Sequence, residues 1–164
     1  MILFHGSNTS FNEIDLTKSL PNKDFGRGFY LSDNYEQAEE MAKFKVIISG
    51  GNAVIQSYHA EDSFLEDPTL KIKIFKEYSK EWAEFILANR NNSSDMPIHD
   101  YDIVYGPIAN DKVGVQIRKY KDGSINFDEF LHRLQYMKGI TFQYFFGTEK
   151  SINKLTKLRQ ILNI

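Results

Sequence analysis

The sequence contains no cysteine, which excludes disulfide bonds and thiolate metal sites and fits a reducing compartment. It also lacks a strong charge of one sign, because 20 basic residues nearly balance 22 acidic ones. This balance gives no sign of a general surface for nucleic acid or anionic membranes. No apolar stretch approaches the roughly 20 residues of a membrane span, and MILFHGSNTS at the start does not resemble a secretory signal. We therefore expect a soluble, cytoplasmic protein with no membrane partner.

Familiar ligand-binding signatures are also missing. There is no GxxxxGK[ST] for a phosphate-binding loop and no HExxH for a zinc site. The four histidines are widely spaced, so we expect no metal site. Aromatic residues, by contrast, are abundant, with 13 Phe and nine Tyr among 164 residues. This is enough material for a packed core, and we expect one domain over residues 1–164.

Hydrophobic alternation predicts strands separated irregularly by helices. The expected strands are Ile2–His5, Phe29–Leu31, Ala53–His59, Leu70–Phe75, Asp102–Gly106, Val113–Tyr120 and Ile140–Phe146. The expected helices begin near Asp33 or Asn34 (with Asp33 and Glu36 at capping-box spacing), run from Ser79 to Asn89, follow Asn126 as far as Gly139, and follow Thr148 through Leu155, Leu158 and Leu162. Strands and helices do not alternate strictly, so we expect an α+β fold with mainly antiparallel strands.

Two short stretches carry candidate chemistry. In the first, His5 ends an apolar strand and is followed by Gly6 and Ser7, so backbone groups there can approach a ligand closely. In the second, Gly26-Arg27-Gly28 precedes Phe29-Tyr30-Leu31-Ser32-Asp33. Taken separately, each stretch favours a purely structural interpretation. The first is then a strand end with a turn, and the second is a glycine turn that feeds a core strand, with Tyr30 pointing outward. The other histidines, His59, His99 and His132, are interpreted as surface or structural residues.

The order of these stretches, followed by Phe142-Gln143-Tyr144-Phe145-Phe146, resembles the ADP-ribosyltransferase fold of the diphtheria-toxin and poly-ADP-ribose polymerase type. That fold has split antiparallel sheets flanked by helices and a His–Tyr–Glu triad around a nicotinamide pocket. Over nearly its whole length the chain is similar to a bacterial family of uncharacterised proteins, the DUF3990 group. Further landmarks of that similarity are YDIVYGPIAND (101–111) and QYFFGTEKSINKL (143–155).

The resemblance implies a role for each matching residue. The His5 imidazole would bind ribose hydroxyls of NAD, and the Gly6 backbone would bind the nicotinamide carboxamide with Ser7 beside it. Tyr30 would stack on the nicotinamide ring, and Gly28 would shape the approach. A flat heteroaromatic ring suits an aromatic partner, and an amide suits backbone hydrogen bonds.

Three departures from the family pattern bear on activity. Gln143 stands where the catalytic Glu is expected, and it keeps a carbonyl acceptor but carries no charge. The implied triad is therefore His5, Tyr30 and Gln143. Ala38 replaces a Ser that contacts the carboxamide, and Met41 replaces a second stacking Tyr, so both stand at cofactor-binding positions. Asp111 or Glu149 is a candidate for the missing carboxylate.

The resemblance implies an NAD-dependent mono-ADP-ribosyltransferase that releases nicotinamide and modifies a protein, nucleic acid or small acceptor, without chain elongation. By analogy it would suit the toxin of a toxin–antitoxin pair, with an antitoxin protein as partner. One alternative is a catalytically degenerate domain that binds NAD or ADP-ribose, or that acts only in interactions. Another is an RNA 2′-phosphotransferase, although the near-neutral charge offers no RNA-binding patch.

Overall fold

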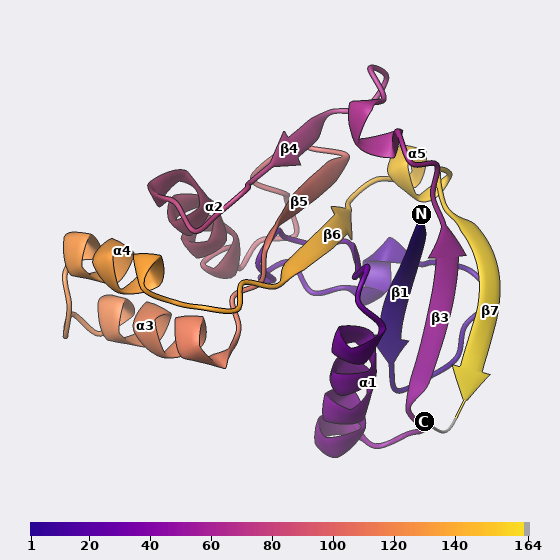
Figure 1. Cartoon of the computed structure of the whole chain (residues 1–164), viewed down its shortest axis with the longest axis horizontal. Helices are drawn as coiled ribbons and strands as arrows, with labels where there is room; N and C mark the ends of the chain where they lie inside the picture. The colour runs from indigo at the N-terminus through magenta and orange to yellow at the C-terminus, as the bar shows by residue number, and fades with distance from the viewer. Residues whose placement is uncertain (163–164) are drawn as a thin grey trace.

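Two β-sheets form the framework of the computed structural model, which describes residues 1–162 (Figure 1). The first sheet is antiparallel, in the order β1 (Ile2–Ser7), β3 (Val54–His59) and β7 (Thr156–Leu162). The second has the order β2 (Phe29–Leu31), β6 (Phe142–Phe146), β5 (Ile103–Pro107) and β4 (Ile72–Ile74). Within it only the β4–β5 pair is parallel. The expected α+β class is therefore confirmed.

The sheets touch where their edge strands β1 and β2 meet. An isolated bridge joins Phe4 to Ser32, with N···O distances of 2.7 Å and 2.9 Å in the two directions. Past this pair, β1 continues along β3, whereas β2 pairs with β6. The chain positions that follow Phe4 on β1 therefore border a split between the two sheets.

Five α-helices lie around this framework within residues 1–162. They are α1 (Tyr35–Ser49), α2 (Lys80–Arg90), α3 (Asp111–Lys121), α4 (Phe127–Gln135) and α5 (Glu149–Ile152). Each begins after a side chain that caps it by accepting a backbone hydrogen bond; the caps are Asn34, Ser79, Asn110, Asn126 and Thr148. Helix α1 packs on β1 and β3, whereas α2, α3 and α4 gather beside the four-stranded sheet (Figure 1).

Two aromatic-rich cores follow from this division. One surrounds the fully buried Trp82 and joins α2, α3 and α4 to the four-stranded sheet; the Trp82 indole N–H donates to the Pro107 carbonyl at 3.1 Å. The other lies around Leu3, Phe29 and Phe146, between the two sheets. Successive residues of β2 point to opposite faces, so Phe29 and Tyr30 belong to different cores.

The expected strand Val113–Tyr120 is wrong, because this segment lies in helix α3. The alternation of Val113, Val115 and Ile117 favoured a strand, but Asn110 caps a helix here. Val113 and Ile117, four residues apart, are buried on its inner face, and Val115 is exposed. A four-residue helical spacing thus prevailed over a two-residue alternation.

The expected long helix after Thr148 is also wrong. Helix α5 ends at Ile152, and residues 156–162 form strand β7 along β3. The apolar spacing that favoured a helix reflects a strand at the edge of a sheet, where Leu158 stays half exposed. Pairing with β3, about 100 residues earlier in the chain, determines the strand conformation of this segment, and local propensity does not.

The expected capping box at Asp33 and Glu36 is replaced by a simpler cap. Asn34 precedes α1, and its side-chain oxygen accepts from the Gln37 amide at 3.1 Å. Asp33 instead accepts a hydrogen bond from the Tyr144 hydroxyl at 3.3 Å. Its carboxylate therefore links the start of α1 to strand β6.

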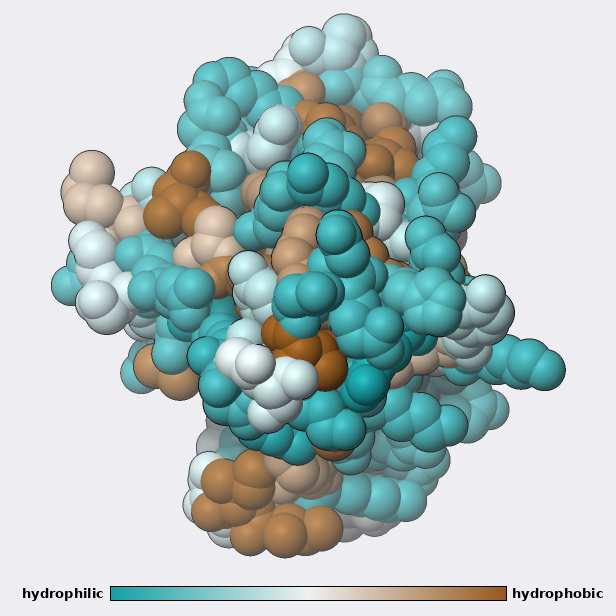
Figure 2. Space-filling model, turned by 90° about the vertical axis from the view of Figure 1, so that its left-hand side faces the viewer, coloured by the Kyte–Doolittle hydropathy of each residue, from teal (hydrophilic) through white to brown (hydrophobic). Residues whose placement is uncertain are grey.

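The surface of α1 is unusually apolar. Met41, Phe44, Ile47 and Ile48 are 47%, 56%, 82% and 64% exposed. Figure 2 shows brown, hydrophobic surface at its lower end, which is the level of α1 in Figure 1. No helix within residues 1–162 is both long and apolar enough to cross a membrane.

Candidate functional site

His5 lies on the edge of β1 that borders β2. Its Nδ1 atom is 2.7 Å from the Tyr30 carbonyl oxygen, and because a carbonyl only accepts, Nδ1 carries the proton. The ring stacks on Phe29 with centroids 4.3 Å apart. Burial, aided by the charges of Lys45 and Lys23, lowers the pKa of His5 to about 3. The imidazole is therefore neutral, and Nε2 is left as an acceptor.

Gly6 follows His5 and directs its backbone groups into the split between the sheets. Phe4 bonds to Ser32 across that split, and residues two apart on a strand direct their N–H and C=O groups to the same side. The Gly6 carbonyl accepts from the Lys45 ammonium at 2.7 Å. A Cβ atom here would lie 1.9 Å from the Ala38 carbonyl oxygen, so only glycine lets α1 pass this close. Ser7, 7% exposed, accepts from the Thr9 amide at 3.3 Å.

Tyr30 is held by the segment that precedes it. Its hydroxyl donates to the Gly26 carbonyl at 2.6 Å and accepts from the Phe25 amide at 3.0 Å. Burial, reinforced by the charge of Asp24, raises the pKa of Tyr30 well above 10. The ring packs against Phe25 and Phe145, and the Lys23 ammonium lies 5.2 Å from its centroid. The hydroxyl therefore has a structural role, whereas the face of the ring contacts the Lys23 ammonium.

The two glycines before Tyr30 serve the path of the chain. Gly26 has φ +89°, a left-handed conformation that favours glycine. At Gly28 a Cβ atom would lie 2.1 Å from the Phe145 ring, so glycine allows the backbone to approach that ring. The Gly28 amide donates to Ser19 Oγ at 3.1 Å. Both glycines thus have a packing reason that is independent of any ligand.

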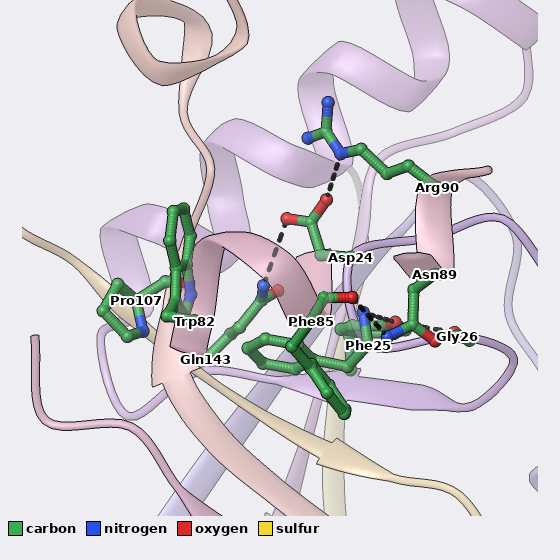
Figure 3. Close-up of polar contacts among 10 residues, drawn as sticks. Asp24, Phe25, Gly26, Trp82, Phe85, Asn89, Arg90, Pro107 and Gln143 are labelled. Atoms are coloured by element: carbon green, nitrogen blue, oxygen red, sulfur yellow. Dashed lines mark hydrogen bonds and ion pairs between the residues drawn. The ribbon is translucent and has the colours of Figure 1, made fainter. Parts of the chain in front are cut away.

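Gln143 and a carboxylate that the sequence did not indicate lie side by side (Figure 3). Gln143 Nε2 is 3.5 Å from Asp24 Oδ2, and Asp24 Oδ1 accepts from Arg90 Nε at 2.7 Å. The Asp24 and Arg90 side chains are only 16% and 27% exposed. No motif in the sequence indicates either residue, although Asp24 stands two positions before Gly26-Arg27-Gly28.

The strand register places Gln143 near Tyr30. Tyr30 pairs with Phe145, and Gln143, two residues from Phe145 along β6, points to the same face of the sheet. His5 approaches β2 from the other face, where Phe29 points. The structure thus forms one group from Tyr30, Gln143 and Asp24 and a second from His5 and Gly6. The backbone of Tyr30 joins them.

The remaining predicted positions lie on helices. Ala38 is buried in α1 against Gly6, and Met41 is exposed one turn further along. Asp111 and Glu149 are exposed first residues of α3 and α5. Within residues 1–162 neither carboxylate makes a hydrogen bond with Gln143. Asp24 is the carboxylate that contacts it.

A cavity of about 330 Å³ is lined in part by Gly26 and Arg27 of the segment before Tyr30. His99, Tyr101 and Phe145 contribute to its lining, and His5, Tyr30 and Gln143 do not. This cavity is therefore lined by other residues than the predicted site residues His5, Tyr30 and Gln143. We assign the candidate chemistry to the residues around Tyr30, where Asp24 contacts Gln143 and the Lys23 ammonium lies over the ring.

Comparison with known proteins identifies the family. The model of the family described as "Protein of unknown function (DUF3990)" matches residues 1–157, and the chain belongs to this family. No curated protein and no solved structure matches the chain.

Proposed function

We propose that this DUF3990 protein is an NAD-dependent mono-ADP-ribosyltransferase. The observation that carries the proposal is the contact of Gln143 with Asp24, which places a carboxylate beside the residue that lacks one. The resemblance of the three motifs to the ADP-ribosyltransferase pattern and the split between two sheets support the same reading. In the proposed reaction ADP-ribose passes from NAD to a protein, nucleic acid or small acceptor, and nicotinamide leaves.

The reaction breaks the bond between ribose C1 and the nicotinamide nitrogen. Nicotinamide departs neutral with the bonding electrons, positive charge develops on the ribose, and the acceptor forms the new bond to C1 and releases a proton. The Asp24 carboxylate, fixed by Arg90, would stabilise that positive charge. The Gln143 carbonyl would accept a hydrogen bond from a ribose hydroxyl. Asp24 would thus provide the negative charge, and Gln143 the hydrogen-bond acceptor, that one glutamate provides in the resembled triad.

The other residues suit the binding of NAD. The Tyr30 ring already carries the Lys23 ammonium over it, and the nicotinamide ring of NAD, also a cation, suits the same electron-rich face. The neutral His5 would accept a hydrogen bond from a ribose hydroxyl at Nε2, and the backbone of Gly6 would bind the carboxamide. Gln143 does not provide the charged base that chain elongation uses, so we propose transfer of a single unit.

The test pairs calorimetric titration of NAD with an assay for nicotinamide release. We expect Asp24→Asn to reduce release by about 100-fold, the order of magnitude for loss of one charge that stabilises a transition state. NAD affinity should change less than release. The exposed carboxylates supply matched controls, Asp111→Asn and Glu149→Gln, which should release nicotinamide at the wild-type rate.

Two outcomes contradict the proposal. If the wild-type protein binds NAD but releases no nicotinamide with any acceptor fraction, it is a binding domain. If it binds neither NAD nor ADP-ribose, the nicotinamide pocket itself is wrong.

A further inference from the structure

Lys45 and Lys23 bring two positive charges close to His5. Among the ion pairs of residues 1–162 neither lysine has a partner. Asp24, the nearest sequence neighbour of opposite charge, is bound to Arg90 at 2.7 Å. Both ammonium groups nevertheless lie close enough to His5 to lower its pKa. Lys45 therefore brings a positive charge without an ion-pair partner among the described residues to the Gly6 carbonyl, at the split between the sheets.

The Lys45 ammonium makes a single hydrogen bond among the described residues, to the Gly6 carbonyl at 2.7 Å. Burial and the charge of Lys23 lower the pKa of Lys45 to about 8, so water solvates this ammonium poorly. A neutral carbonyl compensates a charge less well than an anion does. An anionic ligand group at this place would therefore attract Lys45 more strongly than Gly6 does.

We propose that Lys45 determines which ligands bind beside Gly6: its ammonium competes with neutral amides for the Gly6 carbonyl and moves away from this carbonyl to bind a ligand phosphate. This inference rests on the proposed function, because it concerns the same pocket. The Gly6 carbonyl is the group that would accept the carboxamide N–H, so an amide competes with Lys45 for this oxygen. A ligand that also carries phosphate offsets that competition by a charge-assisted bond to Lys45, whose flexible stem allows the ammonium to move.

One consequence concerns the released nicotinamide. Free nicotinamide has no phosphate, so it competes with Lys45 for Gly6 without any compensation. Lys45 therefore promotes departure of this product while it favours the intact dinucleotide. In this role Lys45 affects which ligands bind, and it need not contact the bond between ribose and nicotinamide.

Calorimetric titration with two fragments tests the inference. Nicotinamide has the amide but no phosphate, and ADP-ribose has the phosphates but no amide. We expect Lys45→Met to bind nicotinamide about fivefold more tightly and ADP-ribose about tenfold more weakly, since one charge-assisted bond is lost. Methionine keeps the apolar stem of the side chain, and far-UV circular dichroism checks that the variant is folded.

Two further variants complete this experiment. Lys43→Met removes the same charge from the exposed face of α1, where Lys43 pairs with Glu39 at 2.8 Å, and should change neither affinity by more than about twofold. Lys45→Arg retains the charge and should retain ADP-ribose binding. If Lys45→Met leaves both affinities at wild-type values, the inference is wrong, although the transferase proposal then stands.

A probe without a nucleoside tests the role of Lys45 independently of the transferase proposal. Inorganic pyrophosphate should shift the Lys45 ε-methylene signals in ¹H–¹³C spectra of the wild-type protein, and should bind Lys45→Met about tenfold more weakly. If this occurs and NAD does not bind, the role of Lys45 stands and the transferase proposal fails. If pyrophosphate leaves the Lys45 signals unchanged, Lys45 is not an anion-binding residue.

Discussion

Two histidines flank the segment that leads to Tyr30, and they differ in how many of their nitrogens are engaged. His99 Nε2 donates to the Phe25 carbonyl at 2.7 Å, and its Nδ1 accepts from the Tyr101 amide at 3.1 Å. His5 engages only Nδ1, with the Tyr30 carbonyl. Within residues 1–162 its Nε2 makes no hydrogen bond. Burial lowers the pKa of both imidazoles, so both are neutral near pH 7.

Both histidines are buried and neutral, so the difference between them is the Nε2 atom of His5, which makes no hydrogen bond among the described residues. His99 fills its hydrogen-bonding capacity inside the protein and packs against Phe85, with centroids 4.9 Å apart. This agrees with the structural interpretation made from the sequence. His5 keeps an acceptor available on the side where Gly6, Lys45 and Lys23 converge. The four predictions below test this asymmetry, starting with the largest effect.

Gly6→Ala should have the largest effect, because it changes the His5 side at its tightest point. The added Cβ would lie 1.9 Å from the Ala38 carbonyl oxygen and 2.9 Å from the Ala42 nitrogen, which are backbone atoms of α1. We expect a loss of about 3 kcal/mol in the free energy of unfolding, measured by urea denaturation. Gly114→Ala is the control: its nearest neighbour is 3.8 Å away in a helix, so stability should rise by about 0.5–1 kcal/mol. A fully stable Gly6→Ala protein would contradict the close packing of α1.

His99→Ala and His5→Ala should separate stability from ligand binding. His99→Ala removes two hydrogen bonds, so we expect a loss of about 2 kcal/mol in unfolding free energy with little change in NAD affinity per folded molecule. His5→Ala removes one, so it should cost about 1 kcal/mol and weaken NAD binding about tenfold. Urea denaturation and calorimetry measure the two quantities. Equal effects of both variants on NAD affinity would abolish the distinction.

Tyr30→Phe should distinguish the hydroxyl, which stabilises the segment at Phe25 and Gly26, from the ring, which we propose binds the ligand. Loss of the bonds to Gly26 and Phe25 should lower the unfolding free energy by about 1.5 kcal/mol. The ring stays, so NAD affinity should remain within about twofold of wild type. Tyr30→Leu removes the aromatic face as well and should weaken NAD binding much more than Tyr30→Phe. If the two variants bind NAD equally well, the ring does not contact nicotinamide.

The pH dependence of stability should show the smallest effect. The unfolded chain protonates His5 near pH 6.5, whereas the folded protein protonates it only near pH 3. Its contribution is therefore complete above pH 6.5 and is lost as the pH falls toward 3. Between pH 7 and 5.5 the wild-type protein should lose about 1 kcal/mol more unfolding free energy than His5→Gln does. Parallel stability profiles of the two proteins over this range would show that His5 is not buried as a neutral ring.

Local signals in the sequence predicted much of the fold and indicated some residues of the candidate site. Strand β2 has the predicted bounds, because Gly28 and Asp33 flank a short apolar run. The helices with a clear cap, such as α2 after Ser79, were also predicted closely. The errors at α3 and β7 arose where two periodicities fitted the same residues. There packing and strand pairing decided the structure.

The site residues that the sequence missed are those whose role depends on contacts between distant parts of the chain. Asp24 meets Gln143 across 119 positions, and Arg90 reaches Asp24 across 66. Lys45 reaches Gly6 only because α1 crosses the glycine, 39 positions away. Neither spacing nor composition encodes such distances. Motifs therefore indicated His5, Tyr30 and Gln143, while the charges around them required the tertiary structure.

The bridge between Phe4 and Ser32 gives the joint between the two sheets its own experimental readout. Two hydrogen bonds, at 2.7 Å and 2.9 Å, connect the edge strands there, and each is donated by a backbone amide. Exchange of the Phe4 and Ser32 amide protons with solvent deuterium therefore measures how often this joint opens.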